Sequence, residues 1–427
     1  MLQSETVKKY DTYKDSGIEW IGEIPQEWSI VQVKNLFNIG RGRVISQLEL
    51  DDNGEFPVYS SQTQNNGCLG YIKTYDFDTS QLTWTTDGAN AGTVFLREGK
   101  HNCTNVCGTL QPKNSNINLK YMLYNLVHTA HYHKRQDTNG YKIMNNEMAV
   151  IKVCVPNKIE EQKQIAGYLD KKCGEIDRVV ETEKAVIEKL KEYKQSIITE
   201  AVTKGLDKSV PLKDSGIEWI GKIPQHWEMQ RLKQLISRPL QYGANESGDV
   251  FDENIPRYIR ITDIKIEDNS LKDEGKLSLS TDKAKDYILY DGDILFARSG
   301  ATVGKTFLYK SEYGLSAFAG YLIRATIKET LNPKYIYYFT LSNSYEEWKN
   351  RIFIQATIQN IGANKYNNLE IPLPIKEEQK QIVEYLDKKC SEIDKAIADK
   401  EQVIEKFTEY KKSLIYECVT GKRKVDG

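Results

Sequence analysis

The strongest chemical signature in the sequence resembles a nucleotide-binding loop. Residues 299–306 read SGATVGKT, which differs from the phosphate-binding pattern G-x-x-x-x-G-K-[ST] only at its first position, Ser299. A phosphate loop must lead from a strand into a helix, whose N-terminus receives the phosphate. Residues 306–309 (TFLY) instead have the pattern of a second strand. We therefore predict no nucleotide site; an ATPase centred on Lys305 is the enzyme-class alternative.

The same loop is encoded a second time without the features of a nucleotide site. Residues 87–95 (DGANAGTVF) align with residues 299–307 (SGATVGKTF). Both glycines and the flanking strand patterns are kept, whereas the Lys-Thr pair is lost. Glycine is needed where a chain turns tightly or comes close to a ligand. We interpret both segments as connections between strands, with exposed tips that can approach a ligand.

Histidines and cysteines in the first half of the chain suggest a metal site. They contain no C-x-x-C pair, which is the usual mark of structural zinc. Alignment of the halves places Leu315 and Ala319 opposite Cys103 and Cys107, so small buried apolar positions explain these cysteines. We predict no metal, and the run at 131–136 (HYHKRQ) should face a polyanion or solvent. The potential ligands are His101, Cys103, Cys107, His128, His131 and His133.

The elements that must position these loops are written twice in the sequence. Residues 14–37 match residues 213–236 at 15 of 24 positions, and residues 160–203 match residues 377–420 at 27 of 44 positions. The second pair of blocks is separated more widely than the first, because the segments between the matched blocks differ in length. This order predicts one scaffold that presents two different surfaces.

The two unlike segments, residues 39–157 and 238–375, are predicted to form mixed α/β domains. Each combines strand-like runs with glycine turns, followed by one helix-like stretch and a short terminal strand. Each has about 120 to 140 residues, an ordinary domain size. The strand-like runs are 81–86, 93–97, 257–262, 293–298 and 306–310; the helix-like stretches are 119–127 and 333–342; the terminal strands are 153–156 and 371–374.

Residues 160–203 and 377–420 carry the signal of a long helix. Apolar residues recur at the threes, fours and sevens of a helical seam, and neither segment contains proline. A helix of this length spans roughly 66 Å, so we predict that the two helices pair as an antiparallel coiled coil. A solvated amphipathic helix on a globular body is the alternative. The seam residues are Ile165, Leu169, Ile176, Ile187, Leu190, Ile197, Ile382, Leu386, Ile393, Ile404, Phe407 and Leu414.

Residues 14–37 and 213–236, called straps below, cannot be continuous helices. Gly17, Gly22 and Pro25 interrupt the first copy. We expect the strap tryptophans to pack against the scaffold rather than stack on bases; they are Trp20, Trp28, Trp219 and Trp227. The expected order is a strap with the first domain (1–158), a long helix (159–206), a strap with the second domain (207–375), and a long helix with a tail (376–427). This order constitutes an internal pseudo-twofold repeat.

Composition fits a globular protein but does not by itself indicate a nucleic-acid partner. The 427 residues are 39% hydrophobic and 28% charged, which suits two or three ordinary cores. Charges interrupt every apolar run, so we expect a soluble, unexported, cytoplasmic protein that contacts no membrane. Seven cysteines without a secretion signal are expected to be reduced thiols. The net charge of −1 provides no basic excess for phosphate binding.

Three motifs resemble the specificity subunits of type I restriction-modification systems. They are the strap sequence DSGIEWIG (15–22) with its twin, the helix start EQKQI (161–165) with its twin, and ILFARSGATVGKT (294–306). The first domain matches the third motif only loosely. The likeness spans nearly the whole chain.

The resemblance implies a non-catalytic DNA-binding subunit in which each domain reads one half of an asymmetric bipartite site. Half-sites about one DNA turn apart, roughly 34 to 36 Å, are then expected. The helices would set the spacer and dock two methyltransferase subunits, and restriction (translocase) subunits would complete the enzyme. S-adenosylmethionine, ATP and Mg²⁺ are expected on those partners and no cofactor on this chain. A subunit of a modification-only system and a coiled-coil adaptor with two protein-binding heads are the alternatives.

Candidate contacts to double-stranded DNA are polar and basic side chains near loops. Arginine can bind guanine with two hydrogen bonds, and asparagine or glutamine can bind adenine in the same way. The same residue types cover ordinary surfaces, so solvation is the competing interpretation for each of them. The candidates are Arg41, Arg43, Asn90, Lys134, Arg135, Tyr141 and Lys142 in the first domain, and Gln241, Tyr242, Arg257, Arg260, Arg298, Thr302, Lys305, Gln355 and Asn360 in the second.

Overall fold

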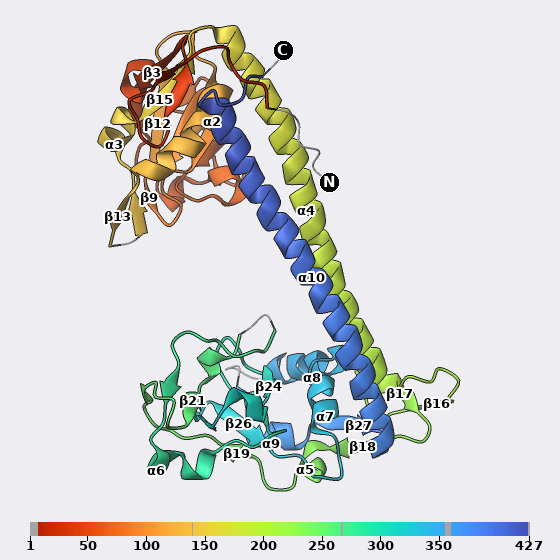
Figure 1. Ribbon diagram of the computed structural model, residues 1–427. Helices are drawn as coiled ribbons and strands as arrows, with labels where there is room; N and C mark the ends of the chain where they lie inside the picture. The colour runs from red at the N-terminus through yellow and green to blue at the C-terminus, as the bar shows by residue number, and fades with distance from the viewer. Residues whose placement is uncertain (1–6, 139, 266–267, 355–359, 426–427) are drawn as a thin grey trace. The chain divides into compact units, whose positions relative to one another are not determined.

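The chain divides into two compact units, which are described separately. The first unit contains residues 1–184 and 401–427, and the second contains residues 185–400. Each of the two long helices therefore contributes one segment to each unit (Figure 1). The structure is a computed structural model and describes residues 7–138, 140–265, 268–354 and 360–425.

Two long helices are present, as the apolar periodicity of the matched segments predicted. Helix α4 spans Ile159–Lys204 and helix α10 spans Lys376–Val419, within one residue of the repeated sequences at both ends. A glycine with positive φ follows each last turn: Gly205 (74°) directly after α4, and Gly421 (72°) after Thr420. Glycine takes this left-handed conformation without the steric penalty of a Cβ, and so ends a helix well.

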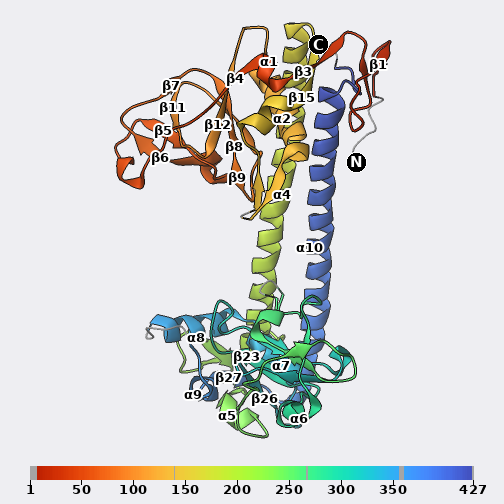
Figure 2. The ribbon, with the colours of Figure 1, turned by 90° about the vertical axis from the view of Figure 1, so that its left-hand side faces the viewer.

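The first unit is built around two four-stranded sheets. One sheet has the antiparallel order β10-β8-β12-β4, and the other has the order β6-β5-β11-β7 with β5 and β11 parallel. All five residues of β8 are buried, as expected for an inner strand. Figure 2 shows the second sheet to one side of the first. The elements are β1 (Tyr13–Asp15), β2 (Glu23–Pro25), β3 (Trp28–Gln32), α1 (Val33–Leu36), β4 (Phe37–Arg41), β5 (Phe56–Tyr59), β6 (Cys68–Ile72), β7 (Phe77–Asp78), β8 (Gln81–Thr85), β9 (Asp87–Gly88), β10 (Val94–Arg97), β11 (Lys100–Cys103), β12 (Cys107–Pro112), α2 (Leu119–Thr129), β13 (Arg135–Asp137), β14 (Gly140–Lys142), α3 (Asn145–Val150) and β15 (Lys152–Pro156).

The second unit repeats the two-sheet plan. The order β19-β26-β23-β24 is antiparallel, and the order β20-β22-β21-β25 contains one parallel pair, β21 with β25. Within this second sheet, β21 and β25 therefore correspond to β5 and β11. The elements are β16 (Leu212–Asp214), β17 (Lys222–Pro224), β18 (Glu228–Arg231), α5 (Leu232–Leu235), β19 (Gln241–Tyr242), β20 (Asp249–Val250), β21 (Arg257–Ile259), β22 (Leu277–Ser278), α6 (Thr281–Ala284), β23 (Ile294–Ala297), β24 (Thr306–Leu308), β25 (Ser316–Phe318), β26 (Leu322–Ala325), α7 (Pro333–Phe339), α8 (Asn343–Ile354), α9 (Ala363–Asn367) and β27 (Glu370–Leu373).

In the first unit, helix α2 joins the sheets to the long helix α4. Lys120 and Tyr124 both bind the carboxylate of Asp170 on α4, at 2.7 and 3.0 Å. The buried hydroxyl of Tyr121 donates to the carbonyl of Cys154 on β15 at 2.8 Å. These contacts fix the orientation of the domain on its own segment of α4.

The second unit makes the same attachment through α7. Lys334 and Tyr338 bind the carboxylate of Asp387 on α10, at 2.7 and 2.6 Å, and Asp387 is the repeat counterpart of Asp170. Tyr335 takes the place of Tyr121 and donates to the carbonyl of Pro372 at 2.8 Å. Figure 1 shows α7 beside α10. The repeat in the sequence therefore corresponds to a repeated attachment of each domain.

Within each unit, the segments of α4 and α10 run antiparallel. In the first unit, Lys411 binds Asp177 at 2.7 Å, and in the second, Lys194 binds Asp394 at 2.6 Å. The repeat aligns Asp177 with Asp394 and Lys194 with Lys411, so the two ion pairs exchange their helices. This is the pairing that a twofold-related contact produces. The predicted antiparallel pairing of the two helices is confirmed within each unit.

The apolar seam supplies the cores between these helix segments. In the first unit, Ile165, Leu169 and Leu414 are fully buried in one hydrophobic core, and Ile382 and Leu386 are fully buried in the core of the second. The remaining seam positions are buried at Ile176, Ile187, Ile197 and Ile393 and half-buried at Leu190, Ile404 and Phe407.

The predicted strands and helices are present, but one strand is shorter than expected and further elements were not predicted, among them α3, α8 and α9. The run at 257–262 is a strand only as far as Ile259, because the chain turns into a 3-10 helix at Ile261–Asp263. Helix α8 was not predicted, although Tyr345, Trp348 and Ile352 recur at helical spacing and pack into the core of the second unit. Among the described helices, none is both long enough and apolar enough to cross a membrane.

Candidate nucleic-acid interface

Each domain carries the same main-chain loop after a central strand. The glycine loops, as they are called below, span residues 87–92 between β8 and β10 and residues 299–304 between β23 and β24. Gly92 N–H donates to the carbonyl of Thr85 at 2.8 Å, and Gly304 N–H donates to the carbonyl of Ala297 at 2.8 Å. Three further N–H to carbonyl bonds recur at the aligned positions. In the first loop they run from Thr85 to Thr93, from Ala91 to Gly88 and from Thr93 to Asn90. In the second loop they run from Ala297 to Lys305, from Val303 to Gly300 and from Lys305 to Thr302.

This geometry explains why the first loop keeps both glycines although it lacks the Lys-Thr pair of the second loop. Gly88 and Gly92 have φ of 90° and 87°, and Gly300 and Gly304 have φ of 77° and 80°. These are left-handed conformations that favour glycine. The segment after the second loop is strand β24, as predicted, so a helix N-terminus that would receive a phosphate does not follow it.

A second piece of chain, distant in the sequence, returns to each glycine loop. Ile143 N–H donates to the carbonyl of Thr86 at 2.9 Å, and Ile361 N–H donates to the carbonyl of Arg298 at 2.9 Å. These return segments bring Tyr141 and Lys142 beside the first loop, through pairing of β14 with β9, and Asn360 beside the second, through a bridge to Ser299. Residues that are far apart in the sequence thus meet at one surface.

Arg41 and Tyr242 occupy the same position in the two domains. Each precedes a glycine, Gly42 or Gly243, whose N–H donates to the carbonyl of Cys107 or Leu322 at 3.1 Å. Each side chain also contacts the return segment of its own domain. Arg41 Nη2 lies 3.2 Å from Met144 Sδ, and the Tyr242 hydroxyl accepts from Ala363 N–H at 3.0 Å.

A cavity opens along each glycine loop. The cavity in the first domain has a volume of about 260 Å³ and includes Asn90, His131 and Lys134 in its lining. The cavity in the second domain has a volume of about 490 Å³ and includes Thr302 and Tyr321. The two cavities share only the glycine loop, because unlike elements line the rest of each one, and the surface common to both domains is therefore that of the loop itself.

In the first domain, most basic candidates near this surface have carboxylate or aromatic partners. Lys134 lies over the ring of Tyr141 at 4.4 Å, and Arg135 binds Glu147 at 2.6 Å. Lys142 binds Asp137 at 2.7 Å, and this hydrogen bond, together with donors from Thr138, holds the pKa of Asp137 well below its usual range. Arg43 is held at the edge of the domain by Glu49 and Asp76, at 2.7 and 3.1 Å.

Arg298 is the basic candidate with the most distinctive environment in the second domain. Its guanidinium lies over the ring of Tyr242 at 4.9 Å. Its Nε is buried and has no hydrogen-bond partner among the described residues. Lys305 is half-buried at the end of the loop, and Asn360 is exposed. Arg298, Tyr242 and Asn360 are thus linked to the start of the second glycine loop, and Lys305 follows its end.

Three other candidates in the second domain have side chains that are engaged within the protein. Arg257 is only 9% exposed and donates to the carbonyl of Lys272. Arg260 binds Asp263 with two hydrogen bonds, and Gln241 donates to the carbonyl of Asp286. The candidate Gln355 lies outside the described residues.

The structure corrects the alignment of the cysteines with the second half. Thr104 N–H donates to the carbonyl of Tyr59 as Ala319 N–H donates to that of Ile259, so Thr104 corresponds to Ala319 rather than to Ser316. The positions opposite Cys103 and Cys107 are accordingly Phe318 and Leu322, and not Leu315 and Ala319. All four side chains at the corrected positions are buried.

The histidines are dispersed rather than gathered around one point. His101 is buried against Gln81, and burial lowers its pKa. His128 lies beside Trp20 and Tyr416, and burial lowers its pKa as well. In the described part of the chain, no group of three or more histidine, cysteine or carboxylate side chains could hold a metal ion.

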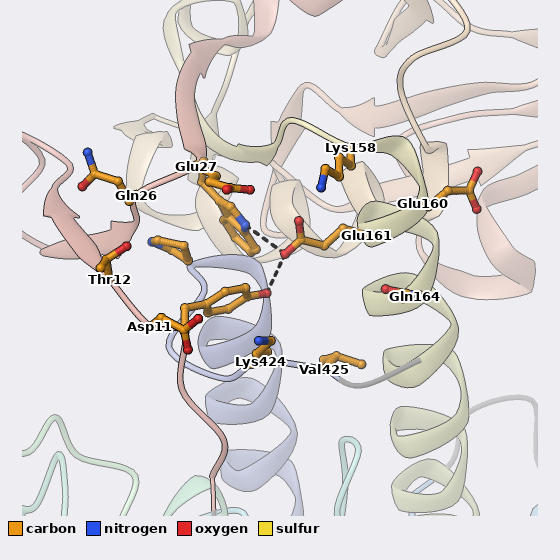
Figure 3. Close-up of a pocket in the computed structure, with 13 residues that line it drawn as sticks. Asp11, Thr12, Gln26, Glu27, Lys158, Glu160, Glu161, Gln164, Lys424 and Val425 are labelled. Atoms are coloured by element: carbon orange, nitrogen blue, oxygen red, sulfur yellow. Dashed lines mark hydrogen bonds between the residues drawn. The ribbon is translucent and has the colours of Figure 1, made fainter.

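A further cavity of about 500 Å³ lies where the first strap meets helix α4 (Figure 3). Its central contact is the carboxylate of Glu161, which accepts hydrogen bonds from Trp28 Nε1 at 3.1 Å and from the Tyr10 hydroxyl at 2.8 Å. In the second unit the counterparts of this pair make the same bond, since Glu378 accepts from Trp227 Nε1 at 3.0 Å. These straps fasten the scaffold, as predicted for Trp28 and Trp227.

The family of the chain follows from its match to a family model. The model, described as a type I restriction modification DNA specificity domain, matches residues 25–192 and 224–406. The chain belongs to this family. Its two matches correspond to the two copies of strap, domain and helix, so one specificity domain is repeated within one chain.

Curated relatives agree with this assignment. A protein of Mycoplasma pneumoniae, named as the N-terminus of a putative type I specificity subunit, is 44% identical over 140 residues, which cover 33% of this chain and 74% of that protein. The specificity subunit of the type I restriction enzyme MjaVIII of Methanocaldococcus jannaschii is 27% identical over 423 residues, with 94% of each chain covered.

Solved structures share the fold. A chain from a study of complex assembly and conformational transition of the type I R-M system superimposes with a TM-score of 0.68 at 12% identity. The match covers 93% of this chain and 99% of that chain. At this identity the likeness concerns the fold alone.

The specificity-domain surface also contains residues that the sequence patterns did not single out. In the first domain, Asn90 Nδ2 donates to Thr63 Oγ1 at 3.2 Å, which places the exposed run 63–66 beside the glycine loop. In the second, Ile261 and Tyr321 line the cavity, and Tyr321 is 60% exposed. The concentration of amides at 62–66 (QTQNN) was the one available signal.

Proposed function

We propose that this chain is the non-catalytic, DNA-reading subunit of a type I restriction-modification enzyme, and that each domain reads one half of a bipartite site. The observation that carries the proposal is that the two domains share one main-chain loop but present different side chains on it. The main-chain bonds of the glycine loops recur in the same pattern, with both glycines kept, while the side chains at the tip change from Asn90 to Thr302. Exposed tips that differ on one backbone suit the recognition of different base sequences.

The side chains around the loops support an asymmetric site. The first surface offers Arg41, Asn90 and Lys134, whereas the second offers Tyr242 and Arg298. Arginine prefers guanine, and asparagine prefers adenine, in the major groove. Since equivalent positions carry different residue types, the two half-sites should differ in sequence.

The long helices support a spacer and a platform for partners in this proposal. Helices α4 and α10 are continuous across the boundary between the units, at residues 184/185 and 400/401. Two methyltransferase subunits would dock on the repeated scaffold, and restriction subunits would add translocation and cleavage. S-adenosylmethionine, ATP and Mg²⁺ would then act on those partners. Partners that contact DNA phosphates would also compensate for the net charge of −1.

A methylome comparison tests the reading function directly. Adenine methylation is mapped in cells that carry the methyltransferase partner, with and without this chain. We expect a bipartite, asymmetric methylated motif that is present only with the chain. Identical methylation in both strains would contradict the proposal.

The spacer role is tested by lengthening both helices together. One heptad is inserted into α4 after Lys184 and one into α10 after Lys400, so that the antiparallel register is kept. Seven helical residues add about 10 Å, or about three base pairs. We expect both half-sites to stay the same while the unread gap grows. A motif with its original gap would refute the spacer role and leave the reading function intact.

A further inference from the structure

The loop between β5 and β6 in the first domain carries four consecutive exposed polar residues. These residues, 63–66, form a wall beside the glycine loop, because Thr63 Oγ1 accepts a hydrogen bond from Asn90 Nδ2 at 3.2 Å. Three of the four are amides, and the segment is called the amide loop below. An amide side chain offers one donor and one acceptor side by side, the arrangement that matches N7 and the amino group of adenine.

The backbone of this amide loop is held in an uncommon conformation. Asn65 and Asn66 have φ of 49° and 53° with ψ of 39° and 34°, so two consecutive non-glycine residues are left-handed. Asparagine tolerates this conformation better than most residues, yet two in succession need support from their surroundings. Their conformation projects both amides from a defined backbone rather than from a freely moving loop.

The support comes from a buried arginine. Arg97, on β10, is 1% exposed and donates from Nη1 to the carbonyl of Asn66 at 2.8 Å. Its guanidinium lies between the rings of Tyr59 and Phe95, at 3.6 and 4.3 Å from their centroids, and Nε donates to Thr83 Oγ1 at 3.1 Å. No carboxylate pairs with it in the described ranges, so the loop carbonyl, the Thr83 hydroxyl and the two rings hold this cation.

The next residue shows how closely arginine and loop are fitted. A Cβ placed on Gly67 would lie 2.8 Å from Arg97 Nη2, and Gly67 has a positive φ of 77°. Arg97 Nη2 has no hydrogen-bond partner of its own in the described structure. A buried charge without a carboxylate is costly for the fold, which argues for a role beyond packing.

The second domain places an unlike loop at the same location. Residues 260–264 follow Ile259 as the amide loop follows Tyr59, and they also lie against a glycine loop, where Ile261 and Thr262 line the cavity with Thr302. A loop at this position is therefore common to both domains, whereas its backbone conformation and its side chains are particular to each domain. This is the distribution expected of a specificity determinant.

We propose that Gln64, Asn65 and Asn66 read adenine in the first half-site, and that Arg97 is the positioning residue that sets their geometry. This inference rests on the proposed reading function. It adds the amide loop to the glycine loop as a second recognition element, and it assigns adenine as the base that the amide loop reads. The second half-site is read without it.

The test replaces donors by acceptors on the exposed loop and maps the methylome in cells that carry the methyltransferase partner. Asn65→Asp and Asn66→Asp keep residues that accept left-handed φ but remove the donor that adenine N7 requires. We expect at least one adenine of the first half-site to lose discrimination by about tenfold or more, with a shift towards cytosine, while the second half-site stays the same.

The matched control is Asn114→Asp. Asn114 is equally exposed, lies in a turn after β12, and uses its Oδ1 to accept from Asn116 N–H, which an aspartate also does. This control should leave both half-sites unchanged. It separates a change at the amide loop from a general effect of added negative charge.

Arg97→Met tests the positioning role. Methionine keeps an apolar body between the two rings but makes neither hydrogen bond. We expect relaxed reading at the same base positions that the Asn65 and Asn66 variants affect. A merely structural role would instead lower methylation at every site without changing base preference, and that result would overturn the assignment of Arg97.

The outcomes separate this inference from the function on which it rests. If the wild-type chain directs no bipartite motif, the reading function fails, and this proposal fails with it. If the wild-type motif is intact and the first half-site is unchanged in both Asn65→Asp and Asn66→Asp, this proposal alone is overturned.

Discussion

Arg298 is the single side chain whose surroundings best fit the proposed contact with DNA. Its guanidinium is stacked on Tyr242, and its buried Nε has no hydrogen-bond partner in the described part of the chain. The planar stacking costs little mobility and leaves the donors at the guanidinium edge oriented. Most other arginines near the surfaces, such as Arg135 and Arg260, are occupied by carboxylates. The residue type alone therefore does not identify a candidate for DNA contact. The interactions that the side chain already makes within the protein distinguish the candidates.

Arg298→Lys should impair reading of the second half-site only. Lysine keeps the charge but loses the planar stack and the fork of donors. We expect a loss of about 1–3 kcal/mol in discrimination at one position of that half-site, measured by the methylome or by competition binding with the assembled complex. The matched control is Arg351→Lys. Arg351 also stacks on an aromatic ring, at 5.0 Å from the centroid of Trp219, but Trp219 belongs to the second strap and not to the surface around the glycine loop. An equal effect of both substitutions would contradict this role.

The glycine loops show how an element can keep its shape while its chemistry varies. Gly88 and Gly300 have positive φ, and a Cβ on either would meet nothing within 4 Å. The space above these residues is therefore open, and backbone conformation is the constraint within the chain. The same open space is what a close approach of DNA to the backbone requires.

Gly88→Ala should reduce methylation more than its folding cost explains. Alanine in a left-handed conformation costs about 1–2 kcal/mol, and its methyl group would stand in the path of the ligand. Gly99→Ala is the control, since Gly99 has φ of 71° and equally open surroundings but lies at the other end of β10. We expect similar losses in unfolding free energy and a loss of methylation for Gly88→Ala alone. Equal activity of the two variants would argue against close approach at the loop.

Elements with strong periodicity or close repetition could be predicted from the sequence, and most of the interface could not. Helices α4 and α10 have unbroken seams, and the strap tryptophans recur, so their locations follow from one sequence. The pairing of Arg41 with Met144 depends on where the chain folds back, which insertions between the halves obscure. The corrected counterpart of Cys103 shows this directly. The amide loop carries no apolar pattern at all, so only the contact between Thr63 and Asn90 reveals it.

At the scale of the whole molecule, each unit contains helix segments from both repeats. In each unit, a segment of α4 pairs with a segment of α10. The pairs Asp177–Lys411 and Lys194–Asp394 are the same contact made twice, with the donor and acceptor helices reversed. Asp170 and Asp387 repeat the attachment of each domain in the same way. The repeated contacts of the helices thus coexist with unlike side chains around the two glycine loops.

Charge reversal tests the exchanged contact. Asp177→Lys places two lysines together and should lower the unfolding free energy by up to about 1 kcal/mol, because the pair is partly exposed. Lys411→Asp in the same chain should restore most of that loss, as a double-mutant cycle in urea measures. Lys184→Glu, which breaks only the local pair with Glu181 on one helix, is the control and should gain nothing from Lys411→Asp. Strict additivity of Asp177→Lys and Lys411→Asp would mean that the contact contributes nothing.

The glycine loop is held by main-chain bonds that make no use of the side chains at its tip. We therefore expect the sequence of residues 299–304, when it is written into positions 87–92, to keep the main-chain bonds that close the turn and to lose only the bond from Asn90 Nδ2 to Thr63 Oγ1. Transplanting the tip alone would then show how much of a half-site is read by the tip and how much by the surface around it. If the tips read DNA as proposed, a chain that keeps its glycines and exchanges its tips would acquire a new target sequence while its fold stays the same.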